Sequence, residues 1–268
     1  MRSAGATSPS YILSASELLT LSVSPAMNPQ KYYKHFIPLE SNPVVFTELI
    51  HRLGTTPSLC FQDVLSLDDI DLLGFISRPV HAMVLVFPTT KAYERRVEVE
   101  DGEVRDVLDG DNVEDVVFFR QTINNACGLY AVLHAVCNGA ARTSIEPESL
   151  IDRLLEKCLP LPPRERALAL GDDEELERVY AEVALEGDTE APSNAEDEVD
   201  FHYIAFVRSH INGHLYQLDG DRKRPLKLAL LEDREDLLSE KCLTVIRSMM
   251  SADGDSLNFS LMALVGQT

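Results

Sequence analysis

Basic residues are scarce in this chain, no two cysteines are spaced as CxxC, and no apolar run is long enough to cross a membrane. Only 24 Lys and Arg residues stand against 44 Asp and Glu residues, so the formal net charge is −20. This charge disfavours nucleic acid and anionic membranes as partners and favours a basic partner. The longest apolar stretches, such as residues 80–87, fall far short of the ~20 residues that a membrane-spanning helix needs.

The cysteine pattern excludes two further classes of protein. The five cysteines are odd in number and widely scattered, which indicates neither a disulfide framework nor a zinc site. Such a pattern suits a reducing compartment, and the sequence predicts a soluble, cytoplasmic protein. The cysteines are Cys60, Cys127, Cys137, Cys158 and Cys242.

The length of 268 residues allows two small domains or one α/β domain. No internal repeat is visible, and no hydrophobic-poor linker separates two cores, so we expect a single α/β domain over residues 31–268. Residues 1–30 are Ser-rich and low in charge. We expect them to form a disordered N-terminal extension, with Met27 as an alternative start.

Local signals place the helices and strands of this domain. A helix over residues 43–53 follows Asn42 as N-cap, has Pro at its first position and ends at Gly54. Short apolar, branched runs predict buried strands of a central sheet, and the proline cluster at residues 160–163 predicts the start of a loop. Further helices are expected over residues 127–136, 148–157 and 240–250, and strands over residues 80–87, 116–119, 203–207, 215–218 and 259–265.

An acidic segment follows the proline cluster. Residues 171–200 hold thirteen acids and a single base, Arg178. Within it, Leu176, Val179 and Val183 are spaced to form one apolar face of a helix. The segment is therefore either a solvated helix and loop or a docking surface for a basic partner.

The segment Gln121-Thr-Ile-Asn-Asn-Ala-Cys127-Gly128 has the arrangement that a nucleophilic thiol needs. It leads from a strand through a polar turn, with Asn124 and Asn125 as possible caps, into a helix whose first turn holds Cys127. The N–H groups and the dipole of a helix N-terminus favour the thiolate, which is the attacking species. The Gln121 amide and the Cys127 N–H are candidate donors to the oxyanion of a tetrahedral intermediate, and Gly128 leaves room for a substrate backbone. The alternative is that Cys127 is a small buried residue and Gln121 a surface polar one.

Two polar residues at the open end of a predicted hairpin are candidate partners of the thiol. A thiolate needs an imidazole, for which His202 is the candidate, and the imidazole needs an acceptor such as Asp219 to fix its tautomer. A hairpin centred between His210 and Ile211 would place Asp219 directly opposite His202, about 5 Å away between Cβ atoms. A two-residue turn at Asn212-Gly213 would instead separate them by about 13 Å, so the mechanism predicts the wider loop.

The other histidines and cysteines receive structural interpretations. His134 lies inside the apolar helix and His81 heads a strand, so both are expected to be paired core histidines. His210 and His214 flank the turn, where we expect them to be exposed. The four remaining cysteines are assigned to packing.

These residues give the chain a resemblance to the ubiquitin C-terminal hydrolases, the deubiquitinating cysteine proteases related to papain-like enzymes. The resemblance covers about residues 30–268 and rests on three motifs in family order, which is more specific than any single cysteine motif. It begins at Phe36-Ile-Pro-Leu-Glu-Ser-Asn-Pro43, continues through residues 80–88, and includes Gln121-Thr-Ile-Asn-Asn-Ala-Cys-Gly128, His134-Ala-Val136, Phe201-His202-Tyr-Ile-Ala-Phe and His214-Leu-Tyr-Gln-Leu-Asp219-Gly220.

The resemblance implies Cys127 as nucleophile, His202 as general base and acid, Asp219 as the residue that orients His202, and Gln121 as oxyanion donor. It implies an α/β, papain-like fold with a central antiparallel sheet flanked by helices and a knotted chain. Residues 159–172 would form a loop that crosses over the active site and admits only small or flexible leaving groups at the C-terminal glycine of ubiquitin. Ubiquitin and its conjugates would be the partners of a monomeric enzyme, and no metal or other cofactor is implied.

The chain departs from the family pattern in three places. Phe36 replaces the usual tryptophan, the turn between His202 and Asp219 is longer by two residues, and the N-terminus is extended. Because the insertion is even, His202 and Asp219 can still share one face of the hairpin. Two alternatives stay open, namely a non-catalytic ubiquitin-binding protein of the same fold and a hydrolase of another ubiquitin-like modifier.

Overall fold

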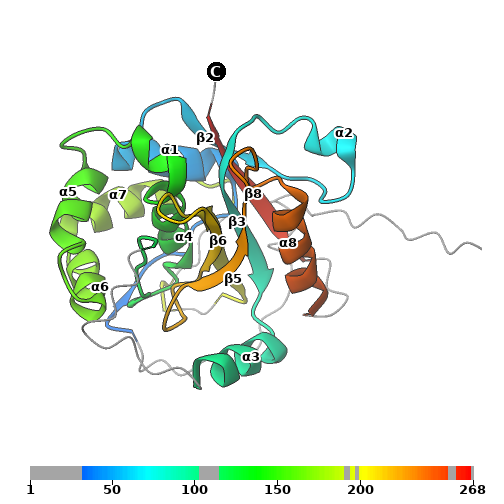
Figure 1. Ribbon diagram of the computed structural model, residues 1–268. Helices are drawn as coiled ribbons and strands as arrows, with labels where there is room; N and C mark the ends of the chain where they lie inside the picture. The colour runs from blue at the N-terminus through cyan, green and yellow to red at the C-terminus, as the bar shows by residue number, and fades with distance from the viewer. Residues whose placement is uncertain (1–31, 103–114, 190–193, 197–198, 253–257, 267–268) are drawn as a thin grey trace, which may run out of the picture.

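A six-stranded antiparallel sheet forms the centre of the protein in the computed structural model, and helices cover both of its faces (Figure 1). The structure describes residues 32–102, 115–189, 194–196, 199–252 and 258–266, so the extension expected at residues 1–30 lies outside the described residues. The strands are β1 (Lys34–His35), β2 (Leu59–Asp63), β3 (Val80–Pro88), β4 (Ile123–Asn124), β5 (Phe201–Arg208), β6 (His214–Leu218), β7 (Leu226–Leu230) and β8 (Ser260–Gly266). The helices are α1 (Pro43–Leu53), α2 (Ile70–Leu73), α3 (Lys91–Gly102), α4 (Cys127–Val136), α5 (Leu150–Cys158), α6 (Pro163–Gly171), α7 (Glu174–Ala184) and α8 (Glu240–Ala252), with a 3₁₀ helix η2 (Gly139–Ser144).

The order of the strands confirms the central antiparallel sheet that the family resemblance implies. The strands follow one another as β2-β8-β3-β5-β6-β7, and β1 and β4 form a separate parallel pair. Val84 and Val86 of β3 belong to the core beneath α1 and α4, whereas Leu85 and Phe87 belong to the core on the side of α8 (Figure 1). Both faces of β3 are therefore buried, which explains why its sequence is an unbroken apolar run.

Helix α1 forms where its capping residues predict it. The Asn42 side chain accepts a hydrogen bond from Val44 N at 2.9 Å, and Pro43 occupies the first helical position. Gly54 ends the helix with φ of +103°, a left-handed conformation that glycine adopts without steric cost. The predicted helices at residues 148–157 and 240–250 and the strand at 259–265 are also present, with ends shifted by one or two residues.

The buried run at residues 116–119 is not a strand, and this prediction is wrong. Asn138 replaces the sheet partner, since its Oδ1 accepts from Val117 N at 2.7 Å and its Nδ2 donates to Val117 O at 2.9 Å. His134 Nε2 accepts from Phe119 N at 3.0 Å. Side chains therefore satisfy the buried backbone that a neighbouring strand would otherwise satisfy.

The proline cluster begins a helix, whereas a loop was predicted over residues 159–172. Pro163 is the first residue of α6, a position that tolerates proline because its N–H would have no helical partner. The Arg166 guanidinium donates to the carbonyl groups of Cys158 and Leu159 at 3.2 and 2.9 Å, which ties α6 to the end of α5. Proline thus excluded the interior of a helix here but not its first turn.

The acidic segment contains helix α7, whose predicted apolar face is buried. Leu176, Val179 and Val183 contribute to the core, and Glu177 on the same helix forms an ion pair with Lys34 at 2.6 Å.

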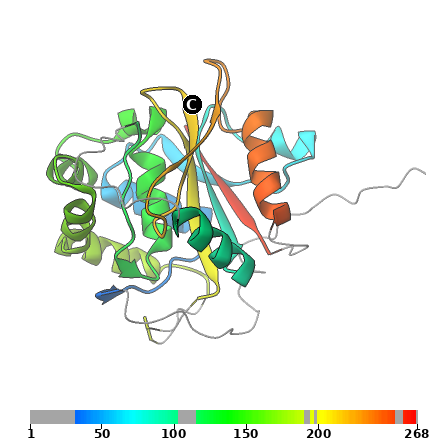
Figure 2. The same ribbon diagram turned by 60° about the horizontal axis from the view of Figure 1, so that its bottom comes forward.

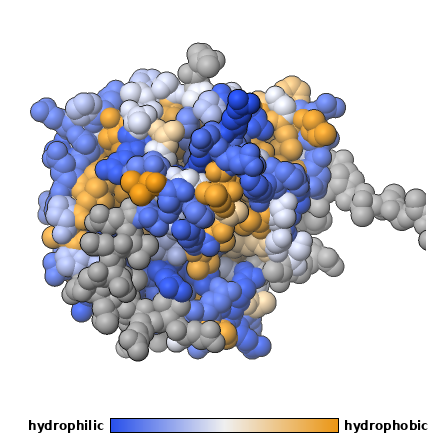
Figure 3. Space-filling view, in the orientation of Figure 1, coloured by the Kyte–Doolittle hydropathy of each residue, from blue (hydrophilic) through white to orange (hydrophobic). Residues whose placement is uncertain are grey.

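Hydrophilic residues cover much of the face drawn in Figure 3, with smaller apolar areas between them. Among the described residues, no helix combines the length and apolar character that crossing a bilayer requires.

The hairpin of β5 and β6 has a register that differs from the predicted one by two residues. Ala205 lies opposite Leu218, so Asp219 follows the last pair and continues the register toward position 204. The prediction that Asp219 lies directly opposite His202 is therefore wrong, but the two positions share a face and meet along the diagonal. The loop is wider than a two-residue turn, since Ser209 N donates to His214 O at 2.8 Å and Ser209 O accepts from Gly213 N at 3.0 Å.

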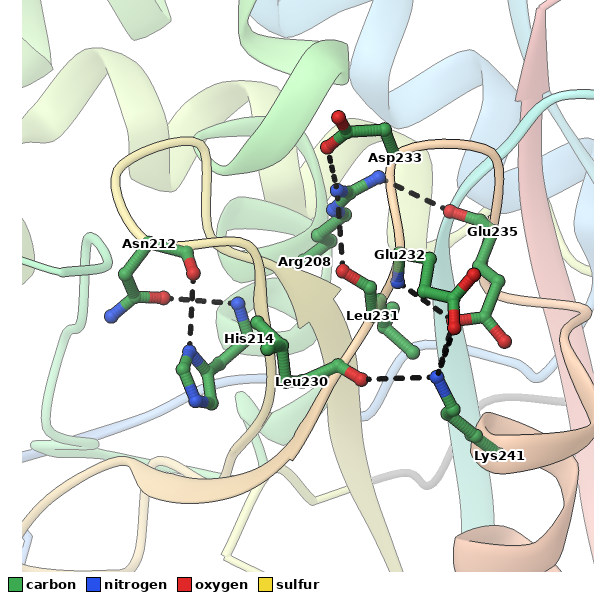
Figure 4. A network of polar contacts seen from close by, with 9 residues as sticks. All are labelled: Arg208, Asn212, His214, Leu230, Leu231, Glu232, Asp233, Glu235 and Lys241. Atoms are coloured by element: carbon green, nitrogen blue, oxygen red, sulfur yellow. Dashed lines mark hydrogen bonds and ion pairs between the residues drawn. The ribbon is translucent and has the colours of Figure 1, made fainter.

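Hydrogen bonds within the hairpin loop explain its width (Figure 4). Asn212 Oδ1 accepts from His214 N at 3.0 Å, and the Asn212 carbonyl contacts His214 Nδ1 at 3.1 Å. His214 is consequently half-buried rather than exposed as predicted, whereas His210 is exposed. Beyond the loop, Arg208 donates to the carbonyl of Glu235, which links β5 to the connection before α8.

Candidate active site

Cys127 is the first residue of α4 and is 8% exposed. The residue before the helix is Ala126, and no side chain among the described residues caps it, so the expected cap by Asn124 or Asn125 is wrong. Asn125 has φ of +57°, and its amide donates instead to the carbonyl of Ala195 at 3.0 Å. The thiol therefore lies at an uncapped helix N-terminus, where the positive end of the helix dipole favours a negative charge.

His202 and Asp219 form a buried hydrogen-bonded pair. The distance from His202 Nε2 to Asp219 Oδ1 is 2.7 Å, and the two side chains are 5% and 0% exposed. Burial lowers the pKa of His202, but the Asp219 carboxylate, with contributions from Cys127 and Asp221, raises that pKa well above its usual value. Burial acts against ionisation of Asp219, yet His202 and the Tyr93 hydroxyl keep the pKa of Asp219 below its usual value. The pair thus favours an imidazolium beside a carboxylate.

A phenol and a backbone amide complete the surroundings of the Asp219 carboxylate. The Tyr93 hydroxyl, from α3, donates to Asp219 Oδ2, and Asp221 N donates to Oδ1 at 3.0 Å. Helix α3 lies at the end of the sheet where β3 ends and β5 begins (Figure 2). Arg222 is 2% exposed and forms an ion pair at 3.2 Å with Asp101, also from α3. These contacts attach α3 to the loop that carries Asp219.

Gln121 lies beside the same loop. Its backbone N–H donates to the carbonyl of Gly220 at 2.7 Å, and its side-chain Nε2 donates to the carbonyl of Ile123 at 3.0 Å. A Cβ added at Gly220 would lie 2.9 Å from the Gln121 Cβ, so this close approach requires glycine. Within the described part of the chain, Gln121 Oε1 is buried and has no hydrogen-bond partner. The Gln121 amide therefore has an oxygen at the site whose hydrogen-bonding potential no described group satisfies.

The remaining candidate residues from the sequence have surroundings that give them structural rather than catalytic roles. Burial lowers the pKa of His134 to about 4, which keeps its Nε2 neutral as an acceptor for Phe119. His81 is half-buried rather than in the core. Gly128 is packed against Leu39, whose Cβ lies 3.0 Å from where a Gly128 Cβ would be, so the prediction that it makes room for substrate is wrong. In the described ranges, no group of three or more His, Cys, Asp or Glu side chains has an arrangement that could hold a metal ion.

The other four cysteines are buried and free of disulfide bonds. Burial raises the pKa of Cys137 and of Cys242 to about 12, so neither thiol ionises at neutral pH. Burial also raises the pKa of Cys158. Their assignment to packing agrees with these surroundings.

Four residues at the site were not anticipated from the sequence. Tyr93, Arg222 and Tyr32 carried no signal, because their partners are distant in the chain: Tyr32, for example, donates to Asp221 across 189 positions at 2.8 Å. Asp221 was the one residue that could have been found, because it follows Asp219 by two positions in a loop at the open end of the hairpin.

Comparisons with known proteins show the family of this chain. The model of the family described as ubiquitin carboxyl-terminal hydrolase, family 1, matches residues 36–251. The ubiquitin carboxyl-terminal hydrolase of Drosophila melanogaster is 36% identical over 227 residues, which cover 85% of this chain and 96% of that protein. The isozyme L1 of Equus caballus is 32% identical over 230 residues, which cover 85% and 96%.

Solved structures show the same fold. The catalytic domain of Trichinella spiralis UCH37 bound to ubiquitin vinyl methyl ester superposes with a TM-score of 0.69 and 23% sequence identity, over 90% of this chain and 99% of that one. This structural likeness shows that the protein has the papain-like α/β fold. The family model and the relatives show the family to which it belongs. The chain belongs to ubiquitin carboxyl-terminal hydrolase family 1.

Proposed function

We propose that the protein is a deubiquitinating thiol hydrolase that cleaves peptide, isopeptide, ester or thioester bonds at the C-terminal glycine of ubiquitin. The observation that carries the proposal is the buried His202–Asp219 pair, whose imidazole also interacts with Cys127 at the N-terminus of α4. The names of the relatives and the ubiquitin-derived ligand of the Trichinella protein support ubiquitin as the substrate.

In the proposed reaction, His202 uses its two nitrogens for different tasks. Nε2 is bound to Asp219 at 2.7 Å, so Nδ1 is the atom that exchanges a proton with Cys127. The raised pKa of His202 favours the imidazolium–thiolate form. The thiolate attacks the carbonyl carbon of the C-terminal glycine, Nδ1–H protonates the leaving group, and a thioester forms. Water then attacks the thioester with His202 as base, which releases ubiquitin and the free thiol.

The oxyanion of each tetrahedral intermediate needs donors, and we assign this role to the Cys127 N–H and the Gln121 amide. The amide nitrogen Nε2 carries two N–H groups, and one of them donates to Ile123 O at 3.0 Å. The second N–H of Gln121 is the proposed donor. The hydrogen bond from Gln121 N to Gly220 O fixes the position of Gln121 relative to the loop that carries Asp219.

We further propose that residues 159–172, with α6, limit the size of the leaving group within a single catalytic domain of residues 31–268. The Thr122 hydroxyl donates to the carbonyl of Ala167 in α6 at 3.2 Å, next to Gln121, which supports a place for this segment beside the site. The free cysteines support a reducing compartment, and a monomeric, cytoplasmic enzyme of the ubiquitin pathway is the corresponding expectation.

Hydrolysis of fluorogenic C-terminal amides tests the proposal. The substrates are ubiquitin and a panel of other ubiquitin-like modifiers, assayed with the wild type and with His202→Gln and Gln121→Ala variants. We expect turnover of the ubiquitin substrate, loss of turnover in His202→Gln, and a loss of about 10²–10³-fold in kcat for Gln121→Ala. Turnover of a different modifier alone would identify that modifier as the substrate, and ubiquitin binding without turnover would favour a non-catalytic binding protein.

A further inference from the structure

A second carboxylate lies near the other nitrogen of the His202 ring. Asp221 Oδ2 lies 3.9 Å from His202 Nδ1, whereas Asp219 Oδ1 lies 2.7 Å from Nε2. The Asp221 side chain is 19% exposed, so solvent screens it only in part. Each nitrogen of the imidazole therefore lies near a different carboxylate, and only Asp219 is within hydrogen-bonding distance.

Two contacts from different parts of the chain fix the position of Asp221. Its backbone N–H donates to Asp219 Oδ1 at 3.0 Å, and its Oδ1 accepts from the Tyr32 hydroxyl at 2.8 Å. Tyr32 precedes β1 and is half-buried. Burial, Asp221, Cys127 and Asp219 together raise the pKa of the Tyr32 phenol, so it stays protonated and acts only as a donor toward the carboxylate.

We propose that Asp221, held by the Tyr32 hydroxyl, is a positioning residue for His202 that stabilises its imidazolium form from the Nδ1 side. The inference rests on the proposed function, in which Nδ1 exchanges protons with Cys127 and the leaving group. A separation of 3.9 Å is too long for a hydrogen bond, so Asp221 contributes its charge and leaves the Nδ1 proton directed at the reacting atoms.

The other groups around His202 do not provide this effect. Asp219 acts on Nε2, and the Tyr93 hydroxyl is bound to Asp219. Cys127 on α4 is the group with which Nδ1 exchanges its proton. Arg222, a buried cation in the same loop as Asp221, is paired with Asp101 at 3.2 Å and with Glu100 at 2.5 Å. Asp221 is thus the one carboxylate on the Nδ1 side within 4.0 Å in the described part of the chain.

Titration of the His202 ring by NMR tests the inference without requiring hydrolysis. The variants are built on full-length Cys127→Ala protein, in which the Cys127 thiol no longer contributes to the imidazole pKa. Asp221→Asn removes the charge and keeps the shape, and Tyr32→Phe removes only the hydroxyl. The matched control is Asp233→Asn, which makes the same change in net charge at an exposed side chain beside Arg208, 3.4 Å away (Figure 4). Arg208 ends β5 about 20 Å from His202.

We expect Asp221→Asn to lower the pKa of His202 by about one unit or more, Tyr32→Phe to lower it less, and Asp233→Asn to leave it unchanged. The double variant Tyr32→Phe/Asp221→Asn is expected to match Asp221→Asn alone, because Tyr32 acts through Asp221. An unchanged pKa in Asp221→Asn, an equal decrease in Asp233→Asn, or an additive effect of Tyr32→Phe would each overturn the inference.

Kinetics on the active-cysteine background separates this inference from the proposed function. In Asp221→Asn, the loss of activity at high pH, which follows deprotonation of the imidazolium, is expected to move to lower pH by a similar amount. A wild-type protein that hydrolyses no ubiquitin derivative would refute the proposed function and leave the ring titration to decide the role of Asp221. An unshifted alkaline limb in an active enzyme would refute the inference alone.

Discussion

Removal of one hydroxyl group from α3 should weaken catalysis without removing any residue of the proposed catalytic centre. Tyr93 is 5% exposed, and its hydroxyl donates to Oδ2 of the fully buried Asp219. The ring also packs edge-on against Phe87, with centroids 4.8 Å apart. Tyr93→Phe keeps this packing and deletes only the donor, so Asp219 retains His202 and the Asp221 N–H as its donors.

The magnitude follows from the charge and burial of the acceptor. A hydrogen bond to a buried charged group contributes about 1.5–3 kcal/mol, so the free energy of unfolding should fall by roughly 2 kcal/mol. The loss also raises the pKa of Asp219 and removes a contact that orients its carboxylate toward His202. If most of the loss persists in the transition state, kcat/KM falls by roughly 10- to 30-fold, mainly through kcat.

Tyr216→Phe is a matched control for this experiment. Its hydroxyl also donates to a carboxylate, Asp115 Oδ2 at 2.8 Å, and the residue is 2% exposed, but it lies on β6 away from His202. The assays are steady-state hydrolysis of a fluorogenic ubiquitin derivative and urea unfolding. We expect both variants to lose stability and only Tyr93→Phe to lose activity. Wild-type kcat/KM in Tyr93→Phe, or an equal loss in Tyr216→Phe, would refute the role given to this hydroxyl.

Three further predictions concern glycine, asparagine and histidine positions. Gly220→Ala places a Cβ 2.9 Å from the Gln121 Cβ and should lower kcat/KM about 10- to 100-fold, measured against Gly102→Ala, where a Cβ meets no atom of the described residues within 4 Å. Asn138→Ala leaves the buried N–H and C=O of Val117 without these partners, and urea unfolding should show a loss of about 3 kcal/mol. His134, whose pKa burial lowers from 6.5 to about 4, takes up its proton in the unfolded protein first, so the wild type should lose roughly 3 kcal/mol of stability as the pH falls from 6.5 to 4, and His134→Gln should lose less.

Each of these predictions has an outcome that would contradict it. Full activity in Gly220→Ala would mean that the loop moves aside without disturbing Gln121. Wild-type stability in Asn138→Ala would mean that water replaces the amide at Val117. Identical acid unfolding of the wild type and His134→Gln would show that His134 does not govern stability between pH 6.5 and 4.

Local sequence signals predicted those elements whose formation depends on neighbouring residues. Asn42, Pro43 and Gly54 define α1 through contacts within a few positions, so the helix ends could be read directly. The apolar run of β3 predicted a buried strand because both of its faces are covered. The run at residues 116–119 has the same character but is paired with side chains of His134 and Asn138, a difference that no local pattern contains.

The proposed site was predictable in its main residues but not in the groups that support them. His202 and Asp219 were identified as candidate partners, yet the assumed register was wrong because the loop of residues 209–214 closes through contacts of Asn212. Helix α3 has only two buried residues, Tyr93 and Asp101, so its sequence has no apolar periodicity that would predict a helix. Both are buried through polar contacts with the loop after β6, which become visible only once the chain is folded.

The most direct test of the central claim is the mass of the adduct formed with a ubiquitin that carries an electrophile at its C-terminus. All five cysteines are buried, and Cys127 is the one that lies at the N-terminus of α4, where it interacts with His202. We predict one adduct per protein, located at Cys127 by peptide mapping and lost in Cys127→Ala. An adduct on another cysteine, or no adduct despite measurable ubiquitin binding, would contradict the account.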